Sequence, residues 1–316
     1  MSPSLPFIAL GLTGLIWWCQ AHPAVAPAHL APGPATPSRW GLGGWPVWAL
    51  CWVASAALGW ACGLLDAWGV AAVAVCIGLS CWSAHAAMQR PRGATPRWMP
   101  WAAGAFALAL ALHAVPGFHN PLVLDGVQWR PGDPAFTLRA SFDKANAGLM
   151  LWVTVVPRGP LFTGRGRPAL TALAIAGLTT ALTLGGGWAW GLTEPASSWP
   201  RVPGQDWALP LFLLLNLLVT CLAEEAFFRG WLQTTLMRRL SLHGRLGLWC
   251  AVALPAVLFG LAHLGGGPKM AALATLVGLG SGWALACTRR IEAAVLTHFT
   301  VNAVHLLAFT YPARPG

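Results

Sequence analysis

Long apolar runs, separated by short polar or Pro/Gly-rich breaks, recur along the whole chain. Most approach or exceed the roughly 18 residues that a helix needs to cross about 30 Å of hydrocarbon. Lipid offers backbone groups no hydrogen-bond partners, which excludes an open sheet. The pattern therefore predicts an all-α fold, a polytopic transmembrane bundle of about 8–10 membrane helices. The candidate spans are residues 5–19, 43–65, 67–88, 99–118, 145–157, 169–192, 207–237, 246–264, 270–288 and 291–310.

Two polar stretches divide this pattern. In residues 1–40 a Pro/Ala-rich linker follows the first apolar run, which is either a cleaved signal peptide or a retained helix. We favour the helix, because its start lacks Lys and Arg. Residues 119–144 alternate apolar and polar positions around Pro-Gly-Asp, which predicts a small extracytoplasmic hairpin. We expect residues 41–168 to form an accessory transmembrane region and residues 169–316 the core.

Composition and charge support a membrane protein. The chain is 56% hydrophobic and only 9% charged, whereas soluble domains are about 25% charged. Its net charge of +10 comes from basic residues at the ends of apolar runs, a pattern typical of orienting loop charges and not of a nucleic-acid partner. The basic connections share one side only if 145–157 crosses the membrane or inserts as an equivalent re-entrant element. We predict that it crosses, with these loops cytoplasmic and the N-terminus outside. Their arginines are Arg90, Arg92, Arg97, Arg158, Arg165, Arg167, Arg238, Arg239, Arg245, Arg289 and Arg290.

Two adjacent carboxylates, Glu224 and Glu225, stand inside the apolar run 207–237. Burying a charge at membrane depth costs a few kcal/mol, so such residues are compensated or functional. On a helix Glu225 and Arg229 are four residues apart and can form an ion pair. Glu224 lies about 100° away and can address another group. The trio alone is equally consistent with a structural role in holding the bundle together.

The next helices carry polar residues of their own. His263 follows Phe259 by four residues near the end of one span, and His298 and Asn302 share a face of the last span, with His305 a turn beyond. Each alone is more often a packing residue or an interhelical hydrogen-bonding group than a catalytic one. Three successive helices supplying such groups favour convergence on one site.

Such a cluster can activate water. A poorly solvated glutamate can take a proton from water, while imidazole and amide groups hold the water or a developing oxyanion. Alternatively, Glu224, His263 and His298 could bind a divalent metal such as zinc, which would itself acidify the water. The eight cysteines show no CxxC pair and predict neither a thiolate zinc site nor a disulfide framework.

The three motifs together resemble the type II CAAX prenyl protease and bacteriocin-processing family of intramembrane endopeptidases, also called Abi or CPBP proteins. That family has EExxxR, FxxxH and HxxxN on successive helices. Here they are Glu224 to Arg229, Phe259 to His263, and His298 to Asn302, intact and in order. The resemblance covers about residues 207–310, and it implies that 169–316 is a catalytic core.

The resemblance implies a role for each motif residue. Glu224 would act as the general base toward water, with His263 in the active cavity, and His298 and Asn302 would form the oxyanion site. Supporting roles would fall to Glu225, Arg229 and Phe259. This family has been described both as metal-dependent and as glutamate-type. We expect no obligate cofactor, and a divalent metal is the alternative.

The substrate predicted by the resemblance is a membrane-anchored protein or peptide in the lipid bilayer, processed at a C-terminal, sorting-tail or leader segment. The Ala-, Gly-, Pro- and Trp-rich composition suggests a bacterial inner membrane. Two alternatives stay open: a proton-coupled transporter that uses the same polar residues as a relay, and a non-catalytic immunity or scaffold protein of the same fold. Absence of repeated halves disfavours the transporter.

Overall fold

The computed structural model describes residues 5–21, 41–42, 45–89, 98–155 and 167–314. The predicted linker, residues 22–40, and the basic connections at 90–97 and 156–166 lie outside the described residues. The chain divides into two compact units. Unit 1 comprises Met1–Pro121 and Ser141–Thr163, and unit 2 comprises Leu122–Ala140 and Gly164–Gly316.

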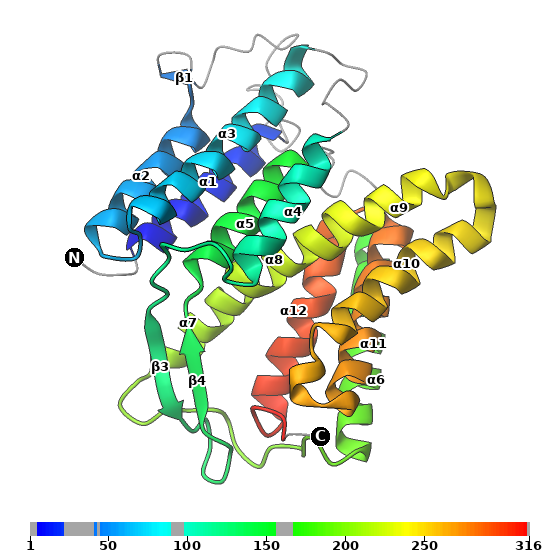
Figure 1. Ribbon diagram of the computed structural model, residues 1–316. Helices are drawn as coiled ribbons and strands as arrows, with labels where there is room; N and C mark the ends of the chain where they lie inside the picture. The colour runs from blue at the N-terminus through cyan, green and yellow to red at the C-terminus, as the bar shows by residue number, and fades with distance from the viewer. Residues whose placement is uncertain (1–4, 22–40, 43–44, 90–97, 156–166, 315–316) are drawn as a thin grey trace, which may run out of the picture. The chain divides into compact units, whose positions relative to one another are not determined.

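Helices dominate both units (Figure 1). Unit 1 contains α1 (Leu5–Ala21), β1 (Gly41–Leu42), β2 (Trp45–Pro46), α2 (Val47–Ala61), α3 (Ala67–Gln89), α4 (Met99–Ala111) and α5 (Phe142–Thr154). Unit 2 contains β3 (Leu122–Val127), β4 (Phe136–Arg139), α6 (Arg167–Ala189), α7 (Ala208–Leu215), η3 (Asn216–Cys221), α8 (Leu222–Glu225), η4 (Ala226–Gln233), α9 (Thr234–Arg239), η5 (Ser241–His243), α10 (Gly244–Leu261), η6 (Leu264–Gly266), α11 (Pro268–Thr288) and α12 (Ile291–Ala308).

The helix α5 is the centre of unit 1. Nearly all of its 13 residues are buried, and α1, α3 and α4 pack against it. Trp52 of α2 donates its indole N–H to Asn146 Oδ1 at 2.7 Å, and the Asn146 amide donates to the Phe142 carbonyl. At about 1.5 Å per residue α5 rises roughly 20 Å, less than a bilayer's hydrocarbon thickness. The predicted crossing by residues 145–157 therefore stays a prediction.

The start of α5 corrects a predicted boundary. The polar insertion was expected to run to residue 144, but the helix already begins at Phe142. Its first turn is held by side chains that the hydrophobic pattern does not reveal. Asn120 Oδ1 accepts the Phe142 N–H at 2.7 Å, and the buried Asp143 carboxylate contacts His113 Nδ1 at 2.6 Å. An acidic residue in the first turn also suits the helix dipole.

The predicted hairpin is confirmed, since β3 pairs antiparallel with β4. It groups with unit 2, although the sequence placed residues 119–144 in the accessory region 41–168. The reason is an aromatic cluster in which Trp129 and Phe136 pack against Phe212 of α7 and Tyr311. The functional division of the chain into domains stays a prediction.

Arg130, between the two strands, fastens the hairpin to the end of α12. Its side chain is buried, and its guanidinium donates to the carbonyls of Leu306, Leu307 and Phe309 at 2.7–3.0 Å. It also donates to the Ser198 carbonyl at 2.6 Å. The last carbonyls of a helix lack intrahelical donors, so this arginine satisfies the C-terminus of α12.

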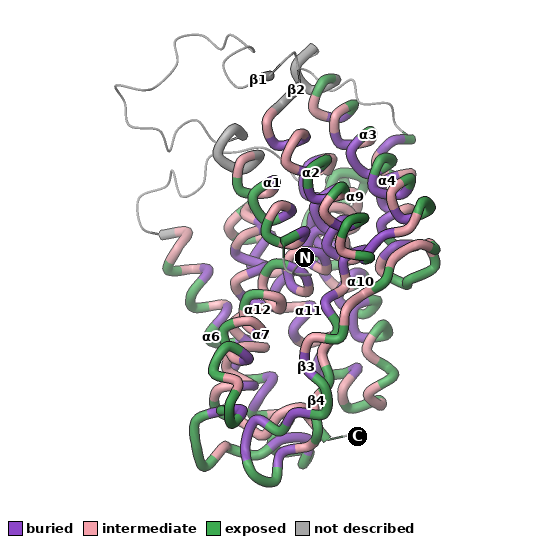
Figure 2. The backbone as a smooth tube through the Cα atoms, turned by 90° about the vertical axis from the view of Figure 1, so that its left-hand side faces the viewer, coloured by how far each residue is buried: buried purple, intermediate pink, exposed green. Residues whose placement is uncertain are grey.

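The helix α6 shows why unit 2 belongs in lipid. Buried and exposed positions alternate along the helix, with buried ones every three or four residues (Figure 2). Leucines stand at several of the exposed positions. A soluble helix would carry polar residues on that exposed face. Here the exposed face is apolar, so it suits hydrocarbon. The exposed leucines are Leu170, Leu173, Leu178 and Leu182.

Six helices of the described residues are long and apolar enough to cross a membrane, and three shorter ones are apolar. The predicted polytopic helical membrane fold is confirmed. Because α10 and α11 run in opposite directions, the connection after α9 and the one between α11 and α12 lie at the same end of unit 2 (Figure 1). This end carries four arginines, Arg238, Arg239, Arg289 and Arg290. That it faces the cytoplasm stays a prediction.

Candidate active site

The helical segment from Ala208 to Arg239 carries Glu224 and Glu225 in a short α-helical stretch between two π-helical ones. A π turn is wider than an α turn and is found often at functional sites. The carboxylate pair is therefore flanked on both sides by irregular turns, η3 and η4, within an otherwise continuous membrane helix. Hydrophobic periodicity did not predict them.

Glu225 and Arg229 form the ion pair that their four-residue spacing predicted. Both side chains are 0% exposed, and Arg229 Nε lies 3.1 Å from Glu225 Oε2. The Nε–H is not aimed at that oxygen as a hydrogen bond, so the contact is primarily electrostatic. The guanidinium also lies 4.9 Å from the Phe259 ring centroid, a cation–π contact with α10.

The same face of this helix bonds to α11. Arg229 donates to the Gly278 carbonyl at 2.8 Å, and Gln233, one turn later, donates to the Gly282 carbonyl at 2.8 Å. Glycine is needed here for close approach: a Cβ on Gly278 would lie 2.8 Å from the Ala256 Cα of α10. Gln233 was missed by sequence reasoning, although its place four residues after Arg229 was a signal.

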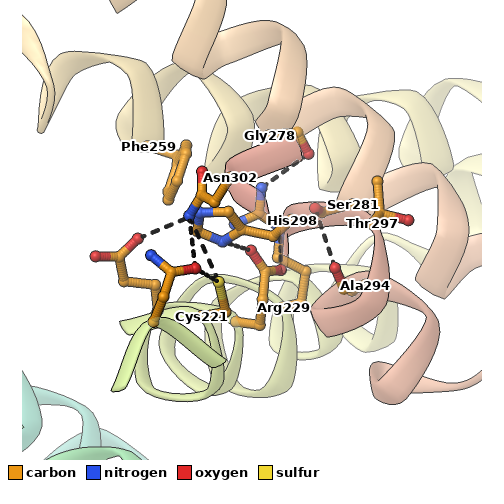
Figure 3. Close-up of polar contacts among 12 residues, drawn as sticks. Cys221, Arg229, Phe259, Gly278, Ser281, Ala294, Thr297, His298 and Asn302 are labelled. Carbon is orange, nitrogen blue, oxygen red and sulfur yellow. Dashed lines mark hydrogen bonds and ion pairs between the residues drawn. The ribbon is translucent and has the colours of Figure 1, made fainter. Parts of the chain in front are cut away.

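His298 of α12 lies between the two carboxylates (Figure 3). Its Nδ1 is 2.9 Å from Glu225 Oε1, and its Nε2 is 3.9 Å from Glu224 Oε2. With Glu225 ionised, Nδ1–H is the donor and the Nε2 lone pair faces Glu224. A 3.9 Å gap is too long for a hydrogen bond but suits one bridging water.

Asn302, one turn after His298, bonds to the π segment η3 (Figure 3). Its Nδ2 lies 3.2 Å from Asn216 Oδ1 and 3.6 Å from Cys221 Sγ. Asn216 and Cys221 were not predicted as site residues, though both are polarisable groups in an apolar run. Because both amide hydrogens face this pair, an oxyanion role for Asn302 requires that one contact opens.

His263 stands just past the end of α10. Its Nδ1 lies 2.8 Å from the Phe259 carbonyl, so Nδ1–H is the donor and Nε2 is the free acceptor. The Phe259 ring packs against both imidazoles, with centroids 4.6 Å from His263 and 5.3 Å from His298. Phe259 therefore fixes the two histidines relative to each other.

A cavity of about 110 Å³ lies between α6, α10, α11 and α12. His263, His298, Asn302 and His305 line it. Glu224 is not among the lining residues, but its Oε2 lies 3.9 Å from Nε2 of His298, which is one of them. The predicted convergence of the three motif helices is confirmed, and His298 is the residue that both the cavity and the carboxylates contact.

Metal binding was the alternative hypothesis for Glu224, His263 and His298. Over the described residues, no group of three or more His, Cys, Asp or Glu side chains is arranged to hold a metal ion. Metal binding by these three residues stays an untested alternative. The Glu225–Arg229 pair instead offers fixed charge beside the imidazole of His298.

Comparison with known families gives one match. Residues 206–304 match the family model described as type II CAAX prenyl endopeptidase Rce1-like. No curated protein and no solved structure matches the chain significantly. The matched segment contains all three motifs and confirms the family resemblance over this part of unit 2.

Proposed function

On the basis that residues 206–304 match the family model described as type II CAAX prenyl endopeptidase Rce1-like, we propose that the protein hydrolyses a peptide bond within the membrane by means of a water activated by Glu224. The family match supports an intramembrane endopeptidase, and six apolar helices support a multi-pass membrane protein. The observation that carries the mechanism is the 3.9 Å gap between Glu224 Oε2 and His298 Nε2.

A water bridging this gap donates one hydrogen to each group and directs an oxygen lone pair at the substrate carbonyl. Glu224 takes a proton as the water oxygen bonds to the carbonyl carbon. The proton then passes to the amide nitrogen as the C–N bond breaks, which yields a carboxylic acid, with the second water hydrogen on its new hydroxyl, and a free amine. General base catalysis of this kind contributes about 10²–10⁴-fold to the rate.

The other motif residues position the catalytic groups and stabilise the oxyanion. Arg229 and Glu225 hold the His298 ring through its Nδ1. His263 offers an acceptor at Nε2 on the cavity wall. Asn302 donates to the oxyanion when it releases Asn216 or Cys221. The contact between Asn302 and the π segment η3 therefore opens during the reaction.

No obligate metal is part of this proposal. A carboxylate beside an imidazole supplies the proton transfer that a metal-bound hydroxide would otherwise supply.

The substrate class is a membrane-anchored protein or peptide, cut at a C-terminal, sorting-tail or leader segment. The bacterial inner membrane is the proposed location. Hydrolysis at this depth requires substrate that already lies in or against the bilayer, because the site residues stand on membrane helices.

The test compares membrane proteomes by terminus-resolved mass spectrometry. One culture produces the wild-type protein, a second Glu224→Gln, and a third Glu194→Gln, a control in which an exposed carboxylate paired with Arg314 is changed. We expect a small set of new termini with wild type and Glu194→Gln that disappears with Glu224→Gln. Identical termini in all three, at equal protein levels, would contradict the proposal and favour the proton-coupled transporter, to be measured as flux.

A further inference from the structure

The cavity beside the histidines has a second polar wall that the motifs do not include. Thr183 of α6 and His305 of α12 line it together with His263, His298 and Asn302. The rest of the wall is largely apolar, with Leu184, Leu273 and Val277 among its residues. The cavity therefore holds polar groups at more than one place along an apolar enclosure.

Two polar atoms on this wall are unsatisfied. Thr183 Oγ1 and His305 Nε2 are both buried, and neither has a hydrogen-bond partner among the described residues. A buried polar group without a partner costs about 1–3 kcal/mol, so each exception needs a physical reason. Two such atoms in one cavity point to a ligand with matching polar groups.

Thr183 differs from several other helical threonines of unit 2. Thr180, three residues earlier on α6, bonds to the carbonyl of Ala176 at 2.8 Å, four residues back. Thr275 and Thr297 bond in the same way to Ala271 and Ala293 at 2.8 Å. This back-bonding is the usual solution for a buried helical threonine. Thr183, only 5% exposed, does not use it.

We propose that Thr183 and His305 form a subsite that hydrogen-bonds the main chain of the substrate beside the scissile bond. An extended peptide presents N–H and C=O groups in turn, and these match an imidazole acceptor and a hydroxyl that can donate or accept. The apolar residues between them contact the adjoining side chain. The cavity has a volume of about 110 Å³.

This subsite rests on the proposed peptidase function, and it explains how the substrate is held in register. Hydrogen bonds to the main chain recognise the peptide irrespective of its sequence, and the small apolar cavity adds selectivity. The hydroxyl of Thr183 contributes binding that is present in both the ground state and the transition state. Its removal therefore raises KM more than it lowers kcat.

The test uses purified protein in lipid nanodiscs and a quenched fluorescent peptide that spans one Glu224-dependent cleavage site. Thr183→Val removes the hydroxyl at constant shape, and Thr183→Ser keeps it. Thr180→Val is the matched control, because that hydroxyl is satisfied by its own helix. His305→Phe removes Nε2 but keeps an aromatic ring against Tyr311, whose centroid is 5.0 Å away.

We expect Thr183→Val and His305→Phe each to lower kcat/KM about 2- to 10-fold, mainly through KM, as the loss of one net hydrogen bond predicts. Thr183→Ser and Thr180→Val keep the wild-type value within about twofold. Wild-type kinetics for both Thr183→Val and His305→Phe would overturn the subsite and assign these groups to bound water. Equal losses in Thr180→Val would also overturn it, since they indicate general destabilisation. If wild type and Glu224→Gln are equally inactive or equally active, the peptidase function fails and the subsite falls with it.

Discussion

Removal of the Arg229 charge is the perturbation whose size the structure defines best. Arg229→Met leaves Glu225, which is 0% exposed, without its cation. The variant also loses the bond to the Gly278 carbonyl and the contact with the Phe259 ring. Breaking a buried ion pair by removing one partner costs about 3–5 kcal/mol, because the other charge stays buried and uncompensated. We therefore expect a loss of this size in the free energy of unfolding.

A double-mutant cycle separates the charge effect from lost packing. Glu225→Gln alone strands the arginine, and its cost falls in the same range of about 3–5 kcal/mol. The double variant Glu225→Gln/Arg229→Met removes both charges, while the Gln oxygen can still accept the His298 Nδ1–H. Its expected cost is below about 2 kcal/mol, because replacing a buried pair with neutral groups is often close to neutral.

The assay is equilibrium unfolding in mixed micelles by SDS, followed by tryptophan fluorescence. The coupling energy is the difference between the double variant and the sum of the two singles. Single-variant losses below about 1 kcal/mol, the value of a solvent-exposed pair, would refute the reasoning. A double variant as unstable as the two singles combined would refute it as well.

Three further predictions follow from other contacts. Gly278→Ala places a Cβ 2.8 Å from the Ala256 Cα, so we expect about 1–3 kcal/mol of destabilisation and a lower melting temperature. The control Gly177→Ala, where a Cβ meets nothing within 4 Å, should keep the wild-type melting temperature. Arg130→Gln removes donors from the last carbonyls of α12, so amide hydrogen exchange at the end of α12 should accelerate while exchange in α10 does not; unchanged exchange at α12 would show that the carbonyls do not need the arginine. Chelators such as EDTA and phenanthroline should leave the cleavage rate within about twofold of the untreated rate if Glu224 alone activates the water; loss of activity that zinc restores would contradict this.

Much of the membrane core was predictable because its signals are local. Charged residues are costly in apolar helices, so Glu224, Glu225 and Arg229 stood out by their position alone. The helical period then paired Glu225 with Arg229 correctly, and the spacing of His298 and Asn302 placed both on one face of α12. Long apolar runs gave the helices of unit 2 with boundaries close to the observed ones.

The contacts between helices were not predictable in the same way. Periodicity assumes a regular helix and so missed the π segments η3 and η4, which bring Cys221 Sγ within 3.3 Å of Asn216 Oδ1. It also gave no partner for His298, because His298 and Glu225 are 73 positions apart in the chain, with α10 and α11 between them. Gly278 accepts a bond from Arg229 through its backbone, and a backbone acceptor leaves little trace in side-chain pattern.

The hairpin shows the same limit on a larger scale. Its strands were predicted from alternation of apolar and polar residues, but its attachment was not. Arg130 looks in the sequence like an exposed loop charge, yet it is 4% exposed and bonds to carbonyls more than 170 residues away. The end of α12, brought back by the fold, gives this buried cation three of its carbonyl acceptors.

The most direct test of Glu224 as the general base is the initial rate of peptide cleavage by purified protein in lipid nanodiscs. Wild type is compared with Glu224→Gln, which keeps the shape of the side chain and removes its basicity, and with Glu194→Gln as the control. The mechanism predicts that Glu224→Gln lowers kcat at least about 100-fold, while Glu194→Gln retains the wild-type rate and all three proteins unfold at the same SDS concentration. A Glu224→Gln rate within a factor of about two of wild type would contradict it.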